Sequence, residues 1–251
     1  MKFLPIVIFF SLFGGVVVLV VLAVVKQGKL WRERPNVLRE FATRRGFSFV
    51  ENPGSPELLT TVRPYRVSET IKRTEVAAAV RGRTIDDPFT LFDIYTQKES
   101  GHDNSRSLTS TYETMISFKT ARTWPEFQLL ALSHVAANTI TAKILQTVMK
   151  LADGMMAQRG LHRVEIPDEP GFQLWVSDPS TGVKTRDGLM RAFKGKSGWW
   201  VGAKNDTVTL MKSAQESSQT SSFVAADALD AFVNEAIELQ RGIREIAATP
   251  Q

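Results

Sequence analysis

The feature that most constrains this chain is an uncharged stretch near its start, because residues 3–25 contain no charged side chain. A helix of that length is about 34 Å long, which is enough to cross a hydrocarbon layer of about 30 Å with modest tilt. Its many valines favour strands in water, but a bilayer offers no partners for exposed backbone groups and therefore imposes a helix. The sequence thus predicts a transmembrane anchor over residues 1–26.

Basic side chains flank this stretch mainly on one side. Seven Lys/Arg lie within residues 26–45, whereas only Lys2 and the terminal amine precede the stretch. The positive-inside rule therefore predicts that the N-terminus lies outside and the C-terminal domain lies in the cytoplasm. The alternative is a cleaved signal peptide ending near Ala23. The uncharged stretch is longer than the apolar core of a signal peptide, which usually has 7 to about 15 residues. Its basic flank also follows the stretch, whereas that of a signal peptide precedes it.

Two sets of residues near the anchor are candidates for contacts. Ser11 and Gly15, with Gly14 beside them, place small residues on one helix face, a spacing that lets another transmembrane helix approach closely. The alternative is the general abundance of glycine in membrane helices. On the cytoplasmic side we expect five residues at headgroup level, in contact with anionic lipids: Lys26, Lys29, Trp31, Arg32 and Arg34.

The net charge of +5 is concentrated in one short segment. Residues 2–45 hold eight of the 31 Lys/Arg and two of the 26 Asp/Glu, so the remaining 23 basic and 24 acidic side chains nearly cancel. This distribution argues against a nucleic-acid-binding surface on the folded domain. The absence of cysteine excludes disulfides and thiolate metal sites.

The remainder of the chain has the pattern of an α+β domain, in which an antiparallel sheet has flanking helices. Helical patterns occur at 36–45, 133–158, 185–194 and 225–246. Alternating apolar residues predict strands at 47–51, 76–80, 89–96, 112–119, 162–166, 172–176, 199–203 and 207–212. We expect a basic juxtamembrane segment with a short helix at 27–46 and a cytoplasmic domain at 47–251. That domain is one unit, or two sub-units at about 47–130 and 160–251 joined by a long helix.

Local signals refine this outline. Asn36 is predicted to cap the first helix after Pro35, and Gly46 to end it. Residues 97–110 are predicted to form a polar loop between two strands, and the segment Trp124-Pro125-Glu126-Phe127 is predicted to end the meander. The KND tripeptide at 204–206 predicts a hairpin turn.

Four segments carry a resemblance to other proteins: RGRTIDDPFTLFDIYT, TSTYETMISF, EPGFQLWVSD and WWVGAKNDTVTLMK. With the anchor and the final helix, they resemble a loose group of uncharacterised bacterial single-pass membrane proteins that have a C-terminal α+β domain of unknown function. The similarity covers most of the chain after the anchor and consists of hydrophobic pattern and turns. The resemblance implies this architecture and no particular activity.

The candidates for acid–base or metal chemistry are three histidines and two carboxylate pairs: His102, His134, His162, Asp86-Asp87 and Asp168-Glu169. No two histidines have the spacing of four that a helical metal site needs. Each carboxylate pair precedes a proline, as turn residues commonly do. The KGKSG segment lacks the first glycine of a phosphate-binding loop, because Met190 stands there. We therefore expect no catalytic residue, no metal and no cofactor.

Trp199 and Trp200 are neighbours on a predicted strand, so their side chains point to opposite faces of the sheet. One is expected in the core, and the other needs a cover. With Lys194 and Lys196 nearby, the uncovered indole would form a surface for a partner or for lipid headgroups. The alternative is that helices or loops bury both rings.

The favoured function is a non-enzymatic accessory or scaffold subunit of a larger integral-membrane assembly, for example a respiratory or photosynthetic complex. Its expected partners are integral membrane proteins, met by the anchor and the soluble domain, and anionic lipid headgroups. One alternative is a membrane-tethered domain that binds a lipid or small ligand, which a continuous apolar cavity would favour. Another is an unrecognised hydrolase-type enzyme, which a deep cleft gathering Asp86, Asp87 or His102 would favour.

Overall fold

The structure is a computed structural model, and it describes residues 28–53, 71–100, 107–131, 150, 152–154, 156–166, 171–212 and 223–248. The predicted transmembrane anchor, its Ser11, Gly14 and Gly15, and Lys26 lie outside these residues. Within the ranges just given, no helix is both long and apolar enough to cross a membrane.

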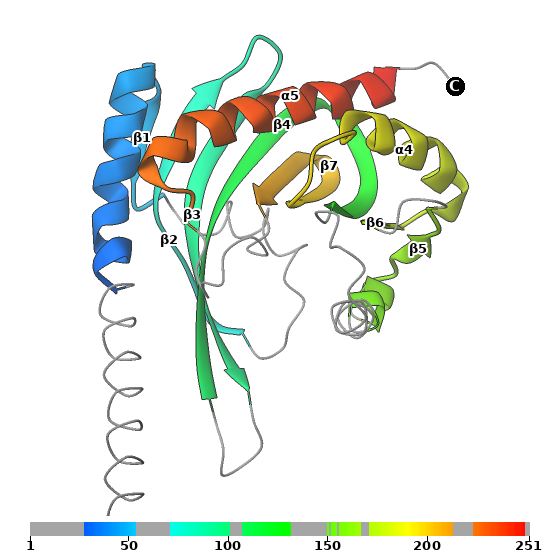
Figure 1. Ribbon diagram of the computed structural model, residues 1–251, viewed down its shortest axis with the longest axis horizontal. Helices are drawn as coiled ribbons and strands as arrows, with labels where there is room; N and C mark the ends of the chain where they lie inside the picture. Colours follow the sequence, from blue (N-terminus) through cyan, green and yellow to red (C-terminus); the bar gives the residue numbers. More distant parts are fainter. Residues whose placement is uncertain are drawn as a thin grey trace, which may run out of the picture.

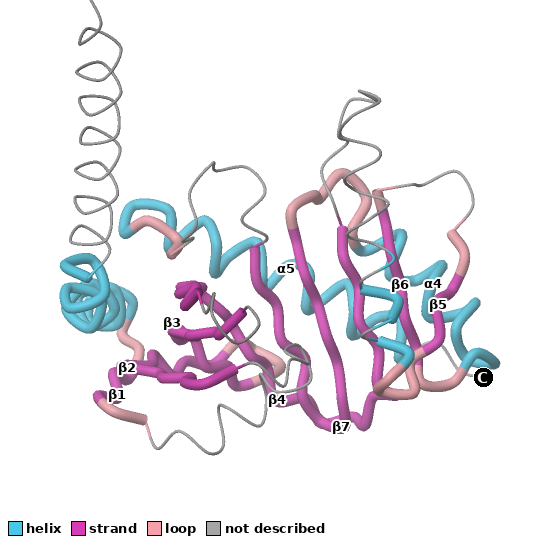
Figure 2. The backbone as a smooth tube through the Cα atoms, turned by 90° about the horizontal axis from the view of Figure 1, so that it is seen from below, coloured by secondary structure: helices cyan, strands magenta, loops and turns pink. Residues whose placement is uncertain are grey.

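Within the described part of the chain, seven strands form one sheet whose pairings are antiparallel, in agreement with the α+β prediction. They are β1 (Ser48–Glu51), β2 (Ile71–Arg83), β3 (Pro88–Ser100), β4 (Ser107–Ala131), β5 (His162–Val164), β6 (Phe172–Val176) and β7 (Trp199–Lys212). The order across the sheet is β1-β2-β3-β4-β6-β5, and β7 also pairs with β4. In Figure 2 β3 is seen nearly end-on, whereas β6 and β7 run lengthwise from top to bottom of the view, which shows a strong twist of the sheet.

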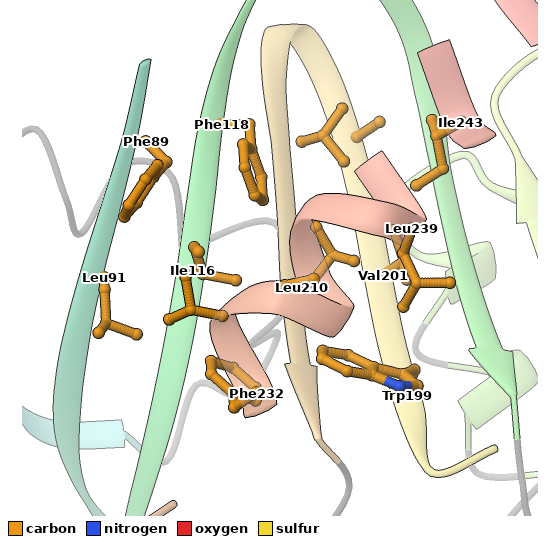
Figure 3. Packing of buried hydrophobic residues seen from close by; sticks show 14 of the residues in the cluster. Phe89, Leu91, Ile116, Phe118, Trp199, Val201, Leu210, Phe232, Leu239 and Ile243 are labelled. Carbon is orange, nitrogen blue, oxygen red and sulfur yellow. The ribbon is translucent and has the colours of Figure 1, made fainter. Parts of the chain in front are cut away.

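The longest strand, β4, forms an arch around β7 (Figure 1 and Figure 3). Its early residues 115–119 pair with residues 207–211, and its late residues 127–131 pair with residues 199–203. The chain of β7 turns back between these two arms near Asn205, whose φ of 54° suits a tight turn. The KND turn predicted from the sequence lies at this point.

Helices cover one face of the sheet. A helix over residues 28–45, α4 (Pro179–Ala192) and α5 (Leu229–Ala248), which follows the 3₁₀ turn η3 (Ala226–Ala228), pack there (Figure 1). Glycines allow α4 and α5 to approach closely, since a Cβ at Gly188 would lie 2.5 Å from the side chain of Ile246. Buried side chains between these helices and the sheet form the main core, which includes Leu38, Phe118, Trp199, Phe232 and Ile243 (Figure 3).

Two smaller apolar clusters lie on the opposite face of the sheet, because side chains alternate between faces along a strand. One contains Val76, Ala79, Phe92, Ile94 and Met115, and the other contains Leu130, Met156, Leu161 and Trp175. The strands therefore carry apolar residues on both faces.

The first helix was predicted over residues 36–45, but it covers residues 28–45. It runs through Pro35 and Asn36, so the prediction that Asn36 is its N-cap is wrong. Proline inside a helix costs about 3 kcal/mol, but the helix is held against the sheet on both sides of Pro35, by Arg34 before it and Leu38 after it. The predicted end at Gly46 is confirmed, with φ of 68°.

Two predictions about β4 are also wrong. Residues 97–100 and 107–110 continue the β3–β4 ladder, so the polar loop predicted at 97–110 is mostly strand. Trp124-Pro125 does not end the unit, because β4 continues to Ala131 and pairs there with β6 and β7. The ladder register shifts on both sides of Trp124, and such an irregularity is where a strand tolerates proline.

Candidate functional site

A buried ionic cluster joins the helix over residues 28–45 to the sheet. Arg34 is 5% exposed and Asp93, on β3, is 2% exposed. The guanidinium donates to both carboxylate oxygens, with Nε 2.7 Å from Oδ2 and Nη2 3.1 Å from Oδ1. This two-point geometry fixes the orientation of the arginine as well as its position.

Two further groups complete this unit, which we call the Arg34 cluster: Arg34, Asp93, Thr114 and Val224. The Thr114 hydroxyl, on β4, donates to Asp93 Oδ1 at 2.6 Å and accepts from the Val224 backbone N–H at 3.1 Å. Arg34 Nη1 donates to the Val224 carbonyl oxygen at 2.9 Å. One arginine therefore ties the helix to β3, β4 and the segment that leads into α5.

An aromatic cluster lies beside the Arg34 cluster and consists of Trp31, Tyr95, Tyr112 and Phe223. The Trp31 ring lies 5.8, 5.7 and 5.8 Å from the ring centroids of the other three. The guanidinium of Arg34 lies 4.8 Å from the centroid of Phe223. Burial, and then the neighbouring Tyr95, raise the pKa of Tyr112.

The residues predicted at the membrane interface divide into two groups. Lys29 and Arg32 are exposed on the helix. Arg34 is not at a lipid surface, because it is buried against Asp93, and the Trp31 ring packs on protein aromatic rings. The headgroup prediction for Arg34 is therefore corrected, since the helix turns that residue toward the sheet.

The two tryptophans of the pair point to opposite faces of the sheet, and one of them lies in the core, as predicted. Trp199 is completely buried, stacks on Phe232 at 5.3 Å between ring centroids and donates Nε1–H to Glu235 at 3.0 Å (Figure 3). Trp200 points to the other face, is half-buried and donates to Gln128 Oε1 at 2.7 Å.

The two lysines of the predicted partner or lipid surface have different positions. Lys194 is exposed just after α4. Lys196 reaches the carboxylates of Glu238 at 3.3 Å and Glu235 at 3.9 Å on α5. Of the four residues predicted for this surface, Lys194 alone is fully exposed, and Trp199 is excluded from it by burial.

Glu235→Gln is expected to weaken the loss of stability in acid. Burial alone would raise the pKa of Glu235, but hydrogen bonds from Lys212 and Trp199, with the charges of Lys212 and Lys196, lower it below its ordinary value of 4.5. A carboxyl group with a lowered folded-state pKa stabilises the fold above its unfolded pKa, and this contribution disappears as the pH falls through the folded-state pKa.

Denaturant unfolding at a series of pH values checks this expectation. The wild type should lose more stability than Glu235→Gln as the pH drops below 4.5. Glu40→Gln, at an exposed position on the helix over residues 28–45, is the matched control and should follow the wild type. If the free energy of unfolding fell equally with pH for Glu235→Gln and the wild type, the lowered pKa of Glu235 would be contradicted.

The carboxylates considered for catalysis have structural contacts in a turn. Asp86 and Asp87 follow Thr84 between β2 and β3, and the Thr84 hydroxyl accepts from both of their backbone N–H groups, at 3.2 and 2.8 Å. The cavity beside them has a volume of about 20 Å³, far below the roughly 300 Å³ of a small-molecule pocket. His162 is exposed on β5, whereas His102, His134, Asp168 and Glu169 lie outside the described ranges. Among the residues whose placement is given, no group of three or more metal-ligating side chains comes together.

Sequence reasoning missed three members of the Arg34 cluster, namely Asp93, Thr114 and Val224. The sequence held a signal for Asp93. It lies two residues from Leu91 and from Tyr95 on a predicted strand, so its side chain shares their face of the sheet. A carboxylate at such a position needs a buried partner. The basic segment just after the predicted anchor supplies it.

Comparisons with known proteins give no relative: no family model, no curated protein and no solved structure matches the chain. The resemblance to bacterial single-pass membrane proteins therefore stays a prediction.

Proposed function

We propose that this protein is a non-enzymatic, single-pass membrane-anchored accessory or scaffold subunit of a larger integral-membrane assembly. In this proposal residues 1–26 span a bacterial inner membrane and the α+β domain lies in the cytoplasm. The uncharged stretch at 3–25 and the seven Lys/Arg that follow it support the anchor and its direction.

The observation that carries the scaffold role is the way the residues next to the anchor join the domain. A tether that only kept a domain near a membrane would work as a flexible, polar linker. Here the helix over residues 28–45 is part of the core through Leu38 and Phe41, and the Arg34 cluster fixes it to β3 and β4. Such a joint would hold the domain in one orientation relative to the anchor, which a subunit that docks on a fixed assembly requires.

The identity of the buried pair supports the same role. A buried ion pair is weak evidence for extra stability, since apolar residues of the same volume often serve as well, and its best-attested use is to specify one arrangement. The hydrogen bonds of Arg34 fit one arrangement of the helix, because its three nitrogens donate to acceptors from Asp93, Thr114 and Val224. Rigid positioning is therefore a better account of this cluster than stability.

Purification of the full chain from its native membrane in mild detergent tests the proposal. We expect an integral membrane protein to co-elute in fixed stoichiometry, and the domain to resist protease added outside intact cells. Retention of the chain in the membrane at alkaline pH reports on the anchor independently. Elution of the chain alone, or digestion of its domain from outside, would contradict the proposal.

A further inference from the structure

The turn over residues 84–87, between β2 and β3, presents an apolar side chain that its structure does not need. Ile85 is 95% exposed, although turns of this kind favour small or polar residues. A single exposed apolar residue is common on protein surfaces. The surroundings of Ile85 distinguish it.

The turn is held rigidly. Its ends are joined by the Thr84 backbone N–H, which donates to the Asp87 carbonyl oxygen at 2.9 Å, and by the Thr84 hydroxyl, which donates to the same oxygen at 3.0 Å. Two side chains of α5 brace it from the adjacent layer, because Arg244 pairs with Asp86, and Gln240 Nε2 donates to Asp87 Oδ2 at 3.4 Å. Ile85 is thus presented in a preorganised position, which lowers the entropic cost of binding.

A small cavity with an unsatisfied acceptor lies beside Ile85. The turn lines it together with Ile237, Gln240, Arg241 and Arg244 of α5, and its volume is about 20 Å³. Gln240 is 3% exposed, and its Oε1 has no hydrogen-bond partner. This acceptor has less than 1 Å² of accessible surface, so the cavity marks imperfect packing between the turn and α5, which a partner covering Ile85 would seal from solvent.

The exposed charges around the turn are mainly positive. Arg83 and Arg241 are exposed, and Arg244 is half-buried. Of the nearby carboxylates, Asp87 is buried, and Asp86 is exposed but paired with Arg244, so the excess positive charge comes from Arg83 and Arg241. A complementary surface would carry acidic groups.

We propose that this turn and the adjacent part of α5 dock a second protein, which receives Ile85 in an apolar pocket with an acidic rim. The inference rests on the proposed function, since it assigns the contact through which the domain meets its assembly. In Figure 1 the turn between β2 and β3 lies at the top of the view, and the dark-blue start of the helix over residues 28–45 lies lower and to the left.

Two variants of the full chain test the assignment, each purified from the native membrane beside the wild type. Ile85→Asp should reduce the co-eluting partner at least about tenfold, as expected for a central contact residue. Arg241→Glu should also reduce the amount of partner, because it reverses a positive charge that would face the acidic rim of the partner's pocket. Gln158→Asp introduces the same side chain at an exposed turn elsewhere and should keep wild-type recovery. Unchanged unfolding midpoints for all variants would show that they fold.

The outcomes separate the two proposals. Wild-type recovery of the partner by Ile85→Asp would overturn the docking site and leave the accessory role intact. Elution of the wild type without any partner would overturn both. Dissociation of a homodimer by Ile85→Asp, with no second protein present, would overturn the proposed partner in favour of a second copy of this chain.

Discussion

Replacing Asp93 with alanine is expected to lower the free energy of unfolding by about 3–5 kcal/mol, the usual effect of removing one partner of a buried ion pair. The substitution leaves the Arg34 guanidinium buried without a carboxylate and removes the acceptor of the Thr114 hydroxyl. Urea unfolding of the full chain in mild detergent, followed by tryptophan fluorescence, measures the change.

Two variants make this test specific. The double variant Arg34→Met with Asp93→Ala should recover much of the loss, because no unpaired charge remains. Glu51→Ala breaks the exposed pair between Arg39 of the same helix and Glu51 of β1, and it should cost about 0–1 kcal/mol. If Asp93→Ala cost no more than Glu51→Ala, Arg34 would not depend on Asp93 for its position.

Replacing Trp199 with alanine is expected to cost about 3–5 kcal/mol, as for other large aromatic residues removed from a core. The indole is completely buried, stacks on Phe232 and lies below α5 (Figure 3). Its loss leaves a cavity between α5 and β7 and leaves Glu235 without the Trp199 donor. Chemical unfolding of the full chain gives the change in stability.

Comparison with two other tryptophan variants identifies the cause. Trp199→Phe keeps an aromatic ring in the layer and loses the hydrogen bond, so it should cost less than Trp199→Ala. Trp200→Ala removes the half-buried neighbour on the opposite face and should also cost less. If Trp200→Ala lowered the free energy of unfolding as much as Trp199→Ala or more, the stability of the fold would not depend mainly on the core that contains Trp199.

Local patterns were enough to predict several elements of this fold. The period-two alternation that includes Ile116 and Phe118 identified the centre of β4, and both residues are buried in the main core. The final helix was predicted at 225–246, and Leu229, Phe232, Val233 and Ala236 along it are buried on one face. In such segments the period of the apolar residues equals the period of the backbone, so sequence alone is informative.

The extent of β4 and the Arg34 cluster could not be predicted in this way. The continuation of β4 past Pro125 depends on pairing with β6 and β7, which lie far along the chain. Arg32 and Arg34 look alike in a basic segment, and the difference between them arises because the helix turns Arg34 toward Asp93, 59 positions away. The charge pattern predicts the side of a membrane, and long-range packing decides which arginine is buried.

The arch of β4 also has a consequence for biosynthesis. Residues 115–119 and 127–131 both pair with β7. The first residue of β7, Trp199, is synthesised only after the 67 residues that follow Ala131. Until then, strand edges that β7 later occupies lack that neighbour, and such edges can pair with other chains. Completion of the sheet must therefore come late in translation, and a nascent chain halted before Trp199 would be a more aggregation-prone species than the finished protein.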